Sequence, residues 1–238
     1  MTRRREGGLR GARGWRLYSA VMRERELLVW DLPVRLCHWA FVVLCGFSWW
    51  SAEEGGLTLQ YHMWSGYALL TLVVFRLLWG FVGSDPARFS NFVHGPRRVL
   101  GSVRELLGPQ PLALAGHNPL GGWMVLLLLL ALALQAVSGL FANDDLLNEG
   151  PLYRHVGKDL SDWFTGVHHL NFTVLLVLVA VHVGAIAWHR FRKGERLVAS
   201  MLHGRKPVPG NAPRLAGTGR ALACLAASAA LVSLIVNL

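Results

Sequence analysis

The sequence is poor in charged residues. Charged side chains make up 16% of its 238 residues and hydrophobic side chains 53%, whereas about a quarter of an average soluble chain is charged. The apolar residues also lie in blocks that are too long for the core helices of an ordinary globular domain. This composition argues against a water-soluble protein and predicts segments that face lipid.

Cysteine is scarce as well. Cys37, Cys45 and Cys224 lie far apart in apolar surroundings, and the sequence has no CxxC or CxxCH motif. A covalently attached c-type haem and a structural zinc site both need such closely spaced cysteines. The sequence therefore indicates neither, and the three cysteines are expected to be small core residues.

Acidic residues are the rarer charged class, with 14 Asp and Glu against 24 Lys and Arg. In a soluble protein this excess of positive charge would suggest a nucleic-acid partner. In a membrane protein it more often reflects basic residues gathered in the cytoplasmic loops. The distribution of the charges along the chain decides between these interpretations.

Five apolar runs approach the ~20 residues that a transmembrane helix needs. The third run, which contains five consecutive leucines at 126–130, is the clearest. The fifth is short, and a helix lying on the membrane surface is its alternative. We expect spans at about 36–52, 62–82, 120–141, 167–188 and 221–238.

The connections between these runs differ in charge. Residues 1–35 contain nine arginines and residues 190–220 contain eight basic residues. Residues 53–61 contain two acidic and no basic residues, and residues 142–166 contain five acidic and two basic ones. The positive-inside rule therefore predicts a multi-pass membrane protein with a cytoplasmic N-terminus. Topology then explains the net charge, and no nucleic-acid partner is expected.

Five histidines lie within or at the ends of the predicted spans, where ionisable side chains are rare and usually face the bundle interior. Any one of them alone could be a group that hydrogen-bonds between helices. A further histidine, His189, is expected at a helix end as an interfacial imidazole. The five are His38, His62, His168, His169 and His182.

The spacing of two of these histidines favours a cofactor. His168 and His182 are 14 residues apart on the fourth span, so they lie within about 40° of one face and about 21 Å apart along the axis. His169 points about 100° away from His168. The fourth span therefore presents one inward histidine near each side of the membrane.

The predicted topology supplies a partner for each of the two. The second span begins at His62 on the periplasmic side, at the depth of His168, and His38 lies near the cytoplasmic start of the first span, at the depth of His182. Two imidazoles that converge at one depth can be the axial ligands of a haem iron. Zinc normally takes four ligands, or three and a water, so these pairs favour haem over zinc.

Two residues on the second span add to this interpretation. Gly66 lies four positions after His62 on the same face, where the missing side chain leaves room for a flat macrocycle or for close helix packing. Arg76 lies 14 positions after His62 and toward the cytoplasm. Its partner would be a haem propionate, or its side chain would extend to the membrane surface.

Four stretches of the chain resemble one family. The sequence at roughly 27–206 is similar to the bacterial cytochrome b561 family, which includes the b-type cytochrome subunits of nickel-iron hydrogenases. The chain differs from many members at His169, where they have an acidic residue. The four stretches are VWDLPVRLCHW (29–39), HMWSGYALLTLVVFRLLWGFVG (62–83), GHNPLGGWMVLLLL (116–129) and GVHHLNFTVLLVLVAVHV (166–183).

The resemblance implies an all-α membrane bundle with a four-helix core and two non-covalent haem b groups, held by His38, His62, His168 and His182. It also implies an electron-transfer subunit of the bacterial inner membrane, acting between a periplasmic c-type cytochrome or hydrogenase-like oxidoreductase and the quinone pool. Such a subunit acts alone or within a quinone oxidoreductase, and the resemblance leaves this open. We expect a basic extension at 1–26, the di-haem domain at 27–206, and a linker with a fifth helix at 207–238.

Two other functions use the same histidines. A transporter would use them to bind a metal ion or a proton, although the sequence lacks the broken helices that transporters show. A haem-free anchor subunit would use them only to join helices. A spectrum of the reduced protein separates the cytochrome from both.

Overall fold

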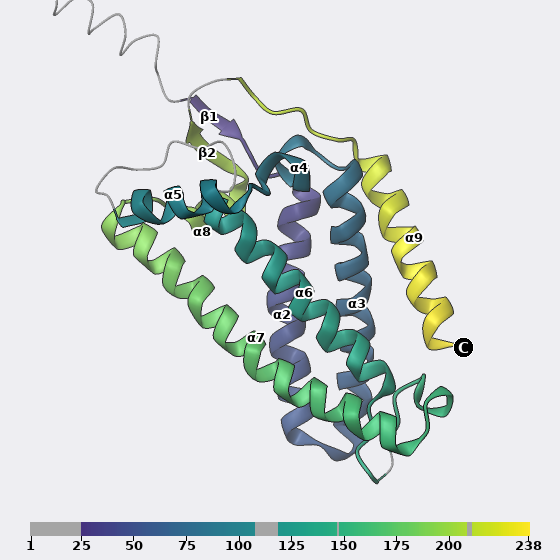
Figure 1. Ribbon diagram of the computed structural model, residues 1–238. Helices are drawn as coiled ribbons and strands as arrows, with labels where there is room; N and C mark the ends of the chain where they lie inside the picture. The colour runs from purple at the N-terminus through teal and green to yellow at the C-terminus, as the bar shows by residue number, and fades with distance from the viewer. Residues whose placement is uncertain (1–24, 108–118, 147, 209–210) are drawn as a thin grey trace, which may run out of the picture.

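The protein is a bundle of long helices (Figure 1). The structure is a computed structural model that describes residues 25–107, 119–146, 148–208 and 211–238. Nearly all of the expected N-terminal extension therefore lies outside the described residues. The predicted class, an all-α helical membrane bundle, is confirmed, with one small β-sheet added.

Five helices of the described part are long and apolar enough to cross a membrane, and they correspond one for one to the five predicted spans. The largest difference is in the fourth helix, which begins at Lys158 rather than near residue 167 because the polar residues before its apolar run are helical too. The five are α2 (Leu32–Glu54), α3 (Leu59–Val82), α6 (Pro119–Phe141), α7 (Lys158–Arg192) and α9 (Thr218–Val236).

Local chemistry explains how α2 begins and ends. The carboxylate of Asp31 accepts a hydrogen bond from the backbone N–H of Val34 at 2.9 Å, which caps the helix. The same carboxylate accepts a bond from the indole N–H of Trp79 on α3 at 2.9 Å. At the other end the chain reverses through Gly55 and Gly56, whose φ angles of 63° and 57° suit glycine.

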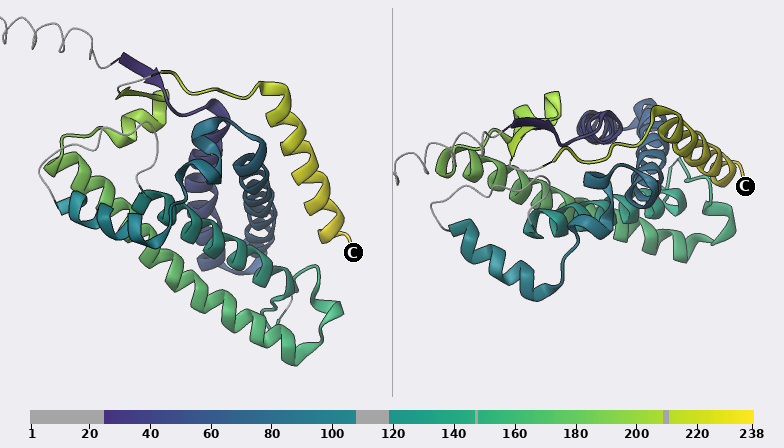
Figure 2. Two further views of the ribbon diagram at one scale, coloured as in Figure 1. Left: turned by 45° about the horizontal axis from the view of Figure 1, so that its top comes forward. Right: turned by 90° about the horizontal axis from the view of Figure 1, so that it is seen from above.

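The long helices form two pairs. Helix α2 packs along α3, and α6 packs along α7. Helix α3 joins the pairs through its contacts with α6, and α9 packs on another face of α3. Figure 2 shows α9 on the far side of α3 from α7. Helix α3 is therefore the central helix of the bundle.

The shorter elements gather at one end of the bundle, which we call the sheet end (Figure 1). Strand β1 pairs antiparallel with β2, and Arg25 lies opposite Val208. The opposite end, which we call the loop end, holds the connections at 55–58 and 142–157. The sheet-end elements are β1 (Arg25–Leu28), α4 (Phe89–Phe92), α5 (Pro96–Leu107), α8 (Leu197–His203) and β2 (Arg205–Val208).

The small sheet was not predicted, and both expected domain boundaries, at 26 and at 206, fall inside it. The backbone N–H groups of Val29 and Trp30 both donate to the carbonyl of Gly204, at 2.8 and 3.1 Å. The segment before α2 is thereby joined to the segment after α7.

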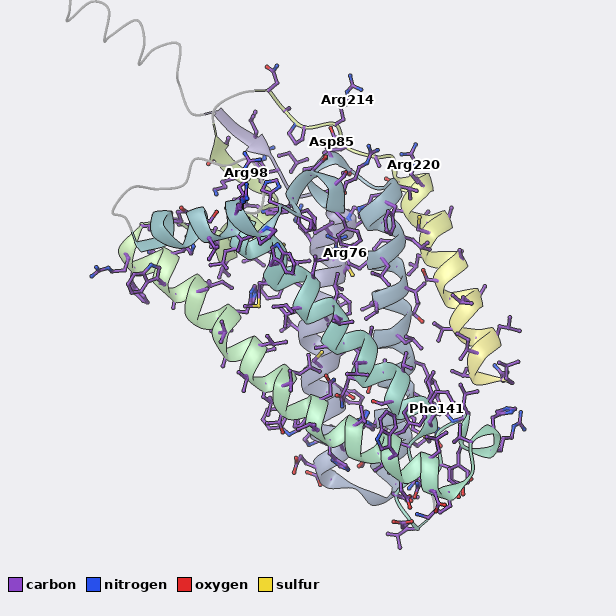
Figure 3. All side chains as sticks on the ribbon, viewed as in Figure 1. Arg76, Asp85, Arg98, Phe141, Arg214 and Arg220 are labelled. Carbon is purple, nitrogen blue, oxygen red and sulfur yellow. The ribbon has the colours of Figure 1, made fainter. Side chains whose placement is uncertain are left out.

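The chain leading to α9 is also anchored at the sheet end. The backbone N–H of Arg214 donates to the Asp85 carboxylate at 3.2 Å, and that of Ala216 to the Ser84 hydroxyl at 2.9 Å. The Arg220 guanidinium donates to the carbonyl of Val82 at 3.1 Å. Figure 3 shows Asp85, Arg214 and Arg220 together at this end, above the buried Arg76.

Two candidate metal centres between paired histidines

At the loop end, two of the predicted histidines face each other. His62 on α3 and His168 on α7 have ring centroids 6.0 Å apart, with their planes at 79°. Both side chains are half-buried. We call His62 and His168 the loop-end pair.

Backbone carbonyls orient both rings of the loop-end pair. His62 Nδ1 lies 2.9 Å from the carbonyl of Ser48 on α2, and His168 Nδ1 lies 2.9 Å from the carbonyl of Gln135 on α6. A carbonyl can only accept, so each Nδ1 carries the proton and donates. Each Nε2 is then left with a lone pair, which is the form that binds a metal.

Helix α6 holds the His168 side chain in place, which the sequence did not indicate. The hydroxyl of Ser138 lies 3.2 Å from His168 Nδ1. Asn171, one turn after His168, donates to the carbonyl of Ala131 at 2.9 Å and to the Gln135 side chain at 2.7 Å. A Cβ on Gly139 would lie 3.1 Å from the His168 ring. These α6 residues hold the ring in one orientation.

A second pair lies toward the sheet end. His38 on α2 and His182 on α7 have ring centroids 6.5 Å apart, with their planes at 55°. Among the described residues, His38 Nδ1 is buried and has no hydrogen-bond partner. We call His38 and His182 the sheet-end pair. The structure therefore brings together the rings of both histidine pairs expected from the sequence. The helices that carry each pair are far apart in the chain.

The spacing of both pairs fits two imidazoles on opposite sides of one metal ion. An imidazole nitrogen binds a transition metal at about 2 Å, which puts two opposed ring centroids roughly 6 Å apart. Within the described ranges, no group of three or more His, Cys, Asp or Glu side chains could hold a metal ion. Each pair thus offers two ligands, and a flat macrocycle would supply the other four.

The two other predicted residues lie on α3. At Gly66 an added Cβ would meet no atom within 4 Å, so this face of α3 is open beside His62. The guanidinium of Arg76 is buried, 5.1 Å from the ring centroid of Phe89 and 5.9 Å from that of Phe92. It does not reach a surface, and its Nη1 has no hydrogen-bond partner among the described residues.

Two glycines make room for the aromatic rings over Arg76. A Cβ on Gly80 would lie 2.1 Å from the Phe89 ring, and one on Gly122 would lie 2.6 Å from the carbonyl of Phe92. Helix α4 can therefore wedge between α3 and α6. The rings partly stabilise the buried cation, but no side chain in the described part forms an ion pair with it.

The remaining span histidines differ from the paired ones. His169 is exposed and contacts the edge of the His168 ring, with centroids 6.3 Å apart. His189 lies in the last turn of α7, at the helix end expected from the sequence, and is only 6% exposed.

Comparisons with known proteins cover most of the chain. A family model for prokaryotic cytochrome b561 matches residues 29–204. A protein of Bradyrhizobium diazoefficiens, described as a probable Ni/Fe-hydrogenase B-type cytochrome subunit, is 25% identical over 213 residues. That alignment covers 75% of this chain and 85% of the relative. No solved structure matches the chain.

Proposed function

Because the chain belongs to the prokaryotic cytochrome b561 family, it is a membrane b-type cytochrome that transfers electrons, and we propose that it does so through two haem b groups. The first would lie between His62 and His168, and the second between His38 and His182. Electrons would pass between a periplasmic redox partner and the quinone pool.

The pairing of the rings is the observation that carries this proposal. Centroid distances of 6.0 and 6.5 Å leave room for one iron between each pair. The rings would hold the iron through Nε2, since Nδ1 of both loop-end histidines is engaged by a carbonyl. A haem bound there supplies a one-electron carrier, and the protein's residues set its orientation and potential.

Gly66 and Arg76 would take supporting roles. The open face at Gly66 would accommodate the macrocycle edge beside His62. Arg76 is a buried cation for which no anionic partner within ion-pair distance is described, and a membrane arginine needs one. A haem propionate at the sheet-end pair would be such a partner, since Arg76 and His38 both lie toward that end.

The charges of the two ends support one orientation. Figure 3 shows Arg98, Arg214 and Arg220 at the sheet end, where most basic residues lie. At the loop end, acidic residues outnumber Arg154 and Lys158, and Lys158 is already paired with Asp145 at 2.5 Å. The sheet end and the N-terminus would therefore be cytoplasmic. The loop-end pair would then be the one near the periplasm.

The partners follow from this orientation. The similarity to a hydrogenase B-type cytochrome subunit supports an oxidoreductase partner, a hydrogenase-like enzyme or a c-type cytochrome, at the periplasmic loop end. Quinone in the bilayer would be the other partner.

Haem content tests the proposal. The purified full-length protein should show a b-type spectrum after dithionite reduction, and a pyridine haemochrome assay should give two haems per chain. A transporter or a haem-free anchor would show no such absorbance. A value near one haem per chain would mean that only one of the two histidine pairs binds haem.

Fusion reporters test the orientation. A reporter after Glu54 or Glu149 should behave as periplasmic, one after Arg98 as cytoplasmic, and one after Leu238 as periplasmic if α9 spans. A cytoplasmic Leu238 would make α9 a surface helix and leave the four-helix core unchanged. A cytoplasmic signal after Glu54 would reverse the whole assignment.

A further inference from the structure

A compact group of ionisable residues lies at the sheet end, outside both histidine pairs. His189 near the end of α7 is 6% exposed, and Lys193 just beyond the helix is 8% exposed. The side chain of Glu195 is 10% exposed and that of Lys206 on β2 is 14% exposed. Charged groups so well buried are unusual and call for a reason.

A glycine turn builds this group. Gly194 has a φ of 69°, which ends α7 and turns the chain back. The backbone N–H of Glu195 then donates to the carbonyl of His189 at 3.2 Å. As a result, Oε2 of Glu195 lies 3.6 Å from His189 Nδ1 and 3.6 Å from Lys206 Nζ. The carboxylate is therefore placed between the imidazole and the ammonium group of β2.

The group also has a fixed relation to the sheet-end pair. His189 follows His182 by seven residues on α7. Seven residues are close to two helical turns, so both side chains share one face, within about 20° and about 10 Å apart along the axis. A change of charge at the pair is therefore felt at His189, across an interior that screens poorly.

The His189 ring has an unused proton-binding position. Its Nδ1 is buried without a hydrogen-bond partner in the described part of the chain. At 3.6 Å the Glu195 carboxylate is too far for a hydrogen bond but near enough to stabilise an imidazolium. The charged groups described as acting on this ring are Glu195, Lys193 and Lys206. A buried ring nitrogen without a hydrogen-bond partner calls for an explanation.

We propose that His189, held by Glu195 and Lys206, is a proton-binding site coupled to electron arrival at the sheet-end pair, an inference that rests on the proposed function. An electron that reaches the haem that His38 and His182 would hold would add one negative charge there. One proton from the cytoplasmic water binds His189 Nδ1, and reoxidation releases it. The sum of charge at this end is then unchanged through the cycle.

This coupling has a definite sign. A proton taken up on reduction makes reduction harder as the pH rises, so the midpoint potential of the sheet-end haem falls with pH while His189 titrates. The fall is expected between the pKa that His189 has while the haem is oxidised and the higher pKa that it has once the haem is reduced. The loop-end haem lies about 21 Å along α7 from the sheet-end histidine, and its potential should respond far less.

Spectroelectrochemical titration of the full-length protein with its haems bound tests the inference. Parent, His189→Gln and the matched control His169→Gln are titrated from about pH 5.5 to about pH 8.5. The parent and the control should show a pH-dependent potential in one haem, and His189→Gln should lose that dependence. A pH-indicator dye should report proton uptake on reduction in the parent and a loss of it in His189→Gln.

A second variant keeps the test decisive if His189→Gln does not accumulate. Glu195→Gln removes the stabilising carboxylate, so the pH-dependent region should move toward lower pH. An unchanged dependence in either variant, or a parent with two haems and flat potentials, overturns the inference while the proposed function stands. Protein without bound haem would instead overturn the proposed function.

Discussion

The loop-end and sheet-end histidine pairs have nearly the same spacing but different surroundings. At the loop end both Nδ1 atoms meet carbonyls at 2.9 Å, supplied by Ser48 and Gln135. At the sheet end His38 Nδ1 has no partner among the described residues. Charged groups lie toward that end instead: Arg76 on α3, and His189 with Glu195 about two helical turns beyond His182.

The difference shows two ways in which a helical bundle can set the midpoint potential of a haem that a histidine pair would hold. Hydrogen bonds from Nδ1–H raise the basicity of the ligand and fix the ring. A buried cation favours the less positive, reduced state of a nearby iron. We therefore expect the sheet-end haem to have the higher midpoint potential.

Removal of single histidines should have the largest effect. His62→Ala and His168→Ala should each lose the loop-end haem, and His38→Ala and His182→Ala should each lose the sheet-end haem, because a missing axial ligand weakens retention. Haem content should fall from two per chain to one, in two spectral and potentiometric classes. His169→Ala is the control and should resemble the parent. If His169→Ala loses the loop-end haem and His168→Ala does not, then His169 and not His168 is the ligand, and the side of α7 that faces the haem is wrongly assigned.

Filling the open face of α3 should have the next largest effect. Gly66→Leu places a side chain where an added Cβ meets nothing within 4 Å, and it should lower the loop-end haem content to roughly half or less by overpacking. The sheet-end haem should be retained. Gly219→Leu on α9 fills an equally open position remote from both pairs and should leave the haem content unchanged. Full occupancy in Gly66→Leu would mean that the macrocycle lies elsewhere.

Neutralising the buried arginine tests the electrostatic side of the contrast. Arg76→Met should lower the midpoint potential of the sheet-end haem, since a cation that favoured the reduced iron is lost. For one unit charge acting through an effective dielectric constant of about 20, the effect is on the order of 1 kcal/mol, or tens of millivolts. Redox titration with Arg88→Gln as the control measures it. Arg88 is more exposed and pairs with Asp85 at 3.8 Å. A shift confined to the loop-end haem would contradict the placement of Arg76.

The hydroxyl beside His168 should matter least. Ser138→Ala removes the Oγ that lies 3.2 Å from His168 Nδ1 but leaves the Gln135 carbonyl. The ligand becomes slightly less basic, so the loop-end potential should rise by roughly 0.5 kcal/mol, or about 20 mV. Ser228→Ala on α9 removes a hydroxyl equally buried and should change neither potential. A fall in the loop-end potential would show that Ser138 acts in another way.

The spans and the pairing of the histidines could be predicted because both depend on rules local to a helix. The length of the apolar runs predicted the five long helices. The 14-residue interval between His168 and His182, with alternating topology, gave the depth of each partner, and the rings meet at those depths. That these rings bind iron stays a prediction.

The surroundings of the rings could not be predicted, because they depend on contacts between remote helices. Nothing in the sequence near His62 indicates that the carbonyl of Ser48 will face it, and the same holds for His168 and Gln135. The pairing of β1 with β2 has no hairpin signal, since Arg25 and Val208 are distant in the chain. Only Gly194, after a basic helix end, carried a usable signal for the turn that buries His189.

The small sheet has a consequence for biosynthesis. Strand β1 leaves the ribosome early, but its partner β2 follows only after four of the five long helices have been made. Synthesis from the N-terminus therefore inserts α2, α3, α6 and α7 before the sheet can form. During that interval the sheet end is not yet fastened, and β2 closes it before α9 has been made.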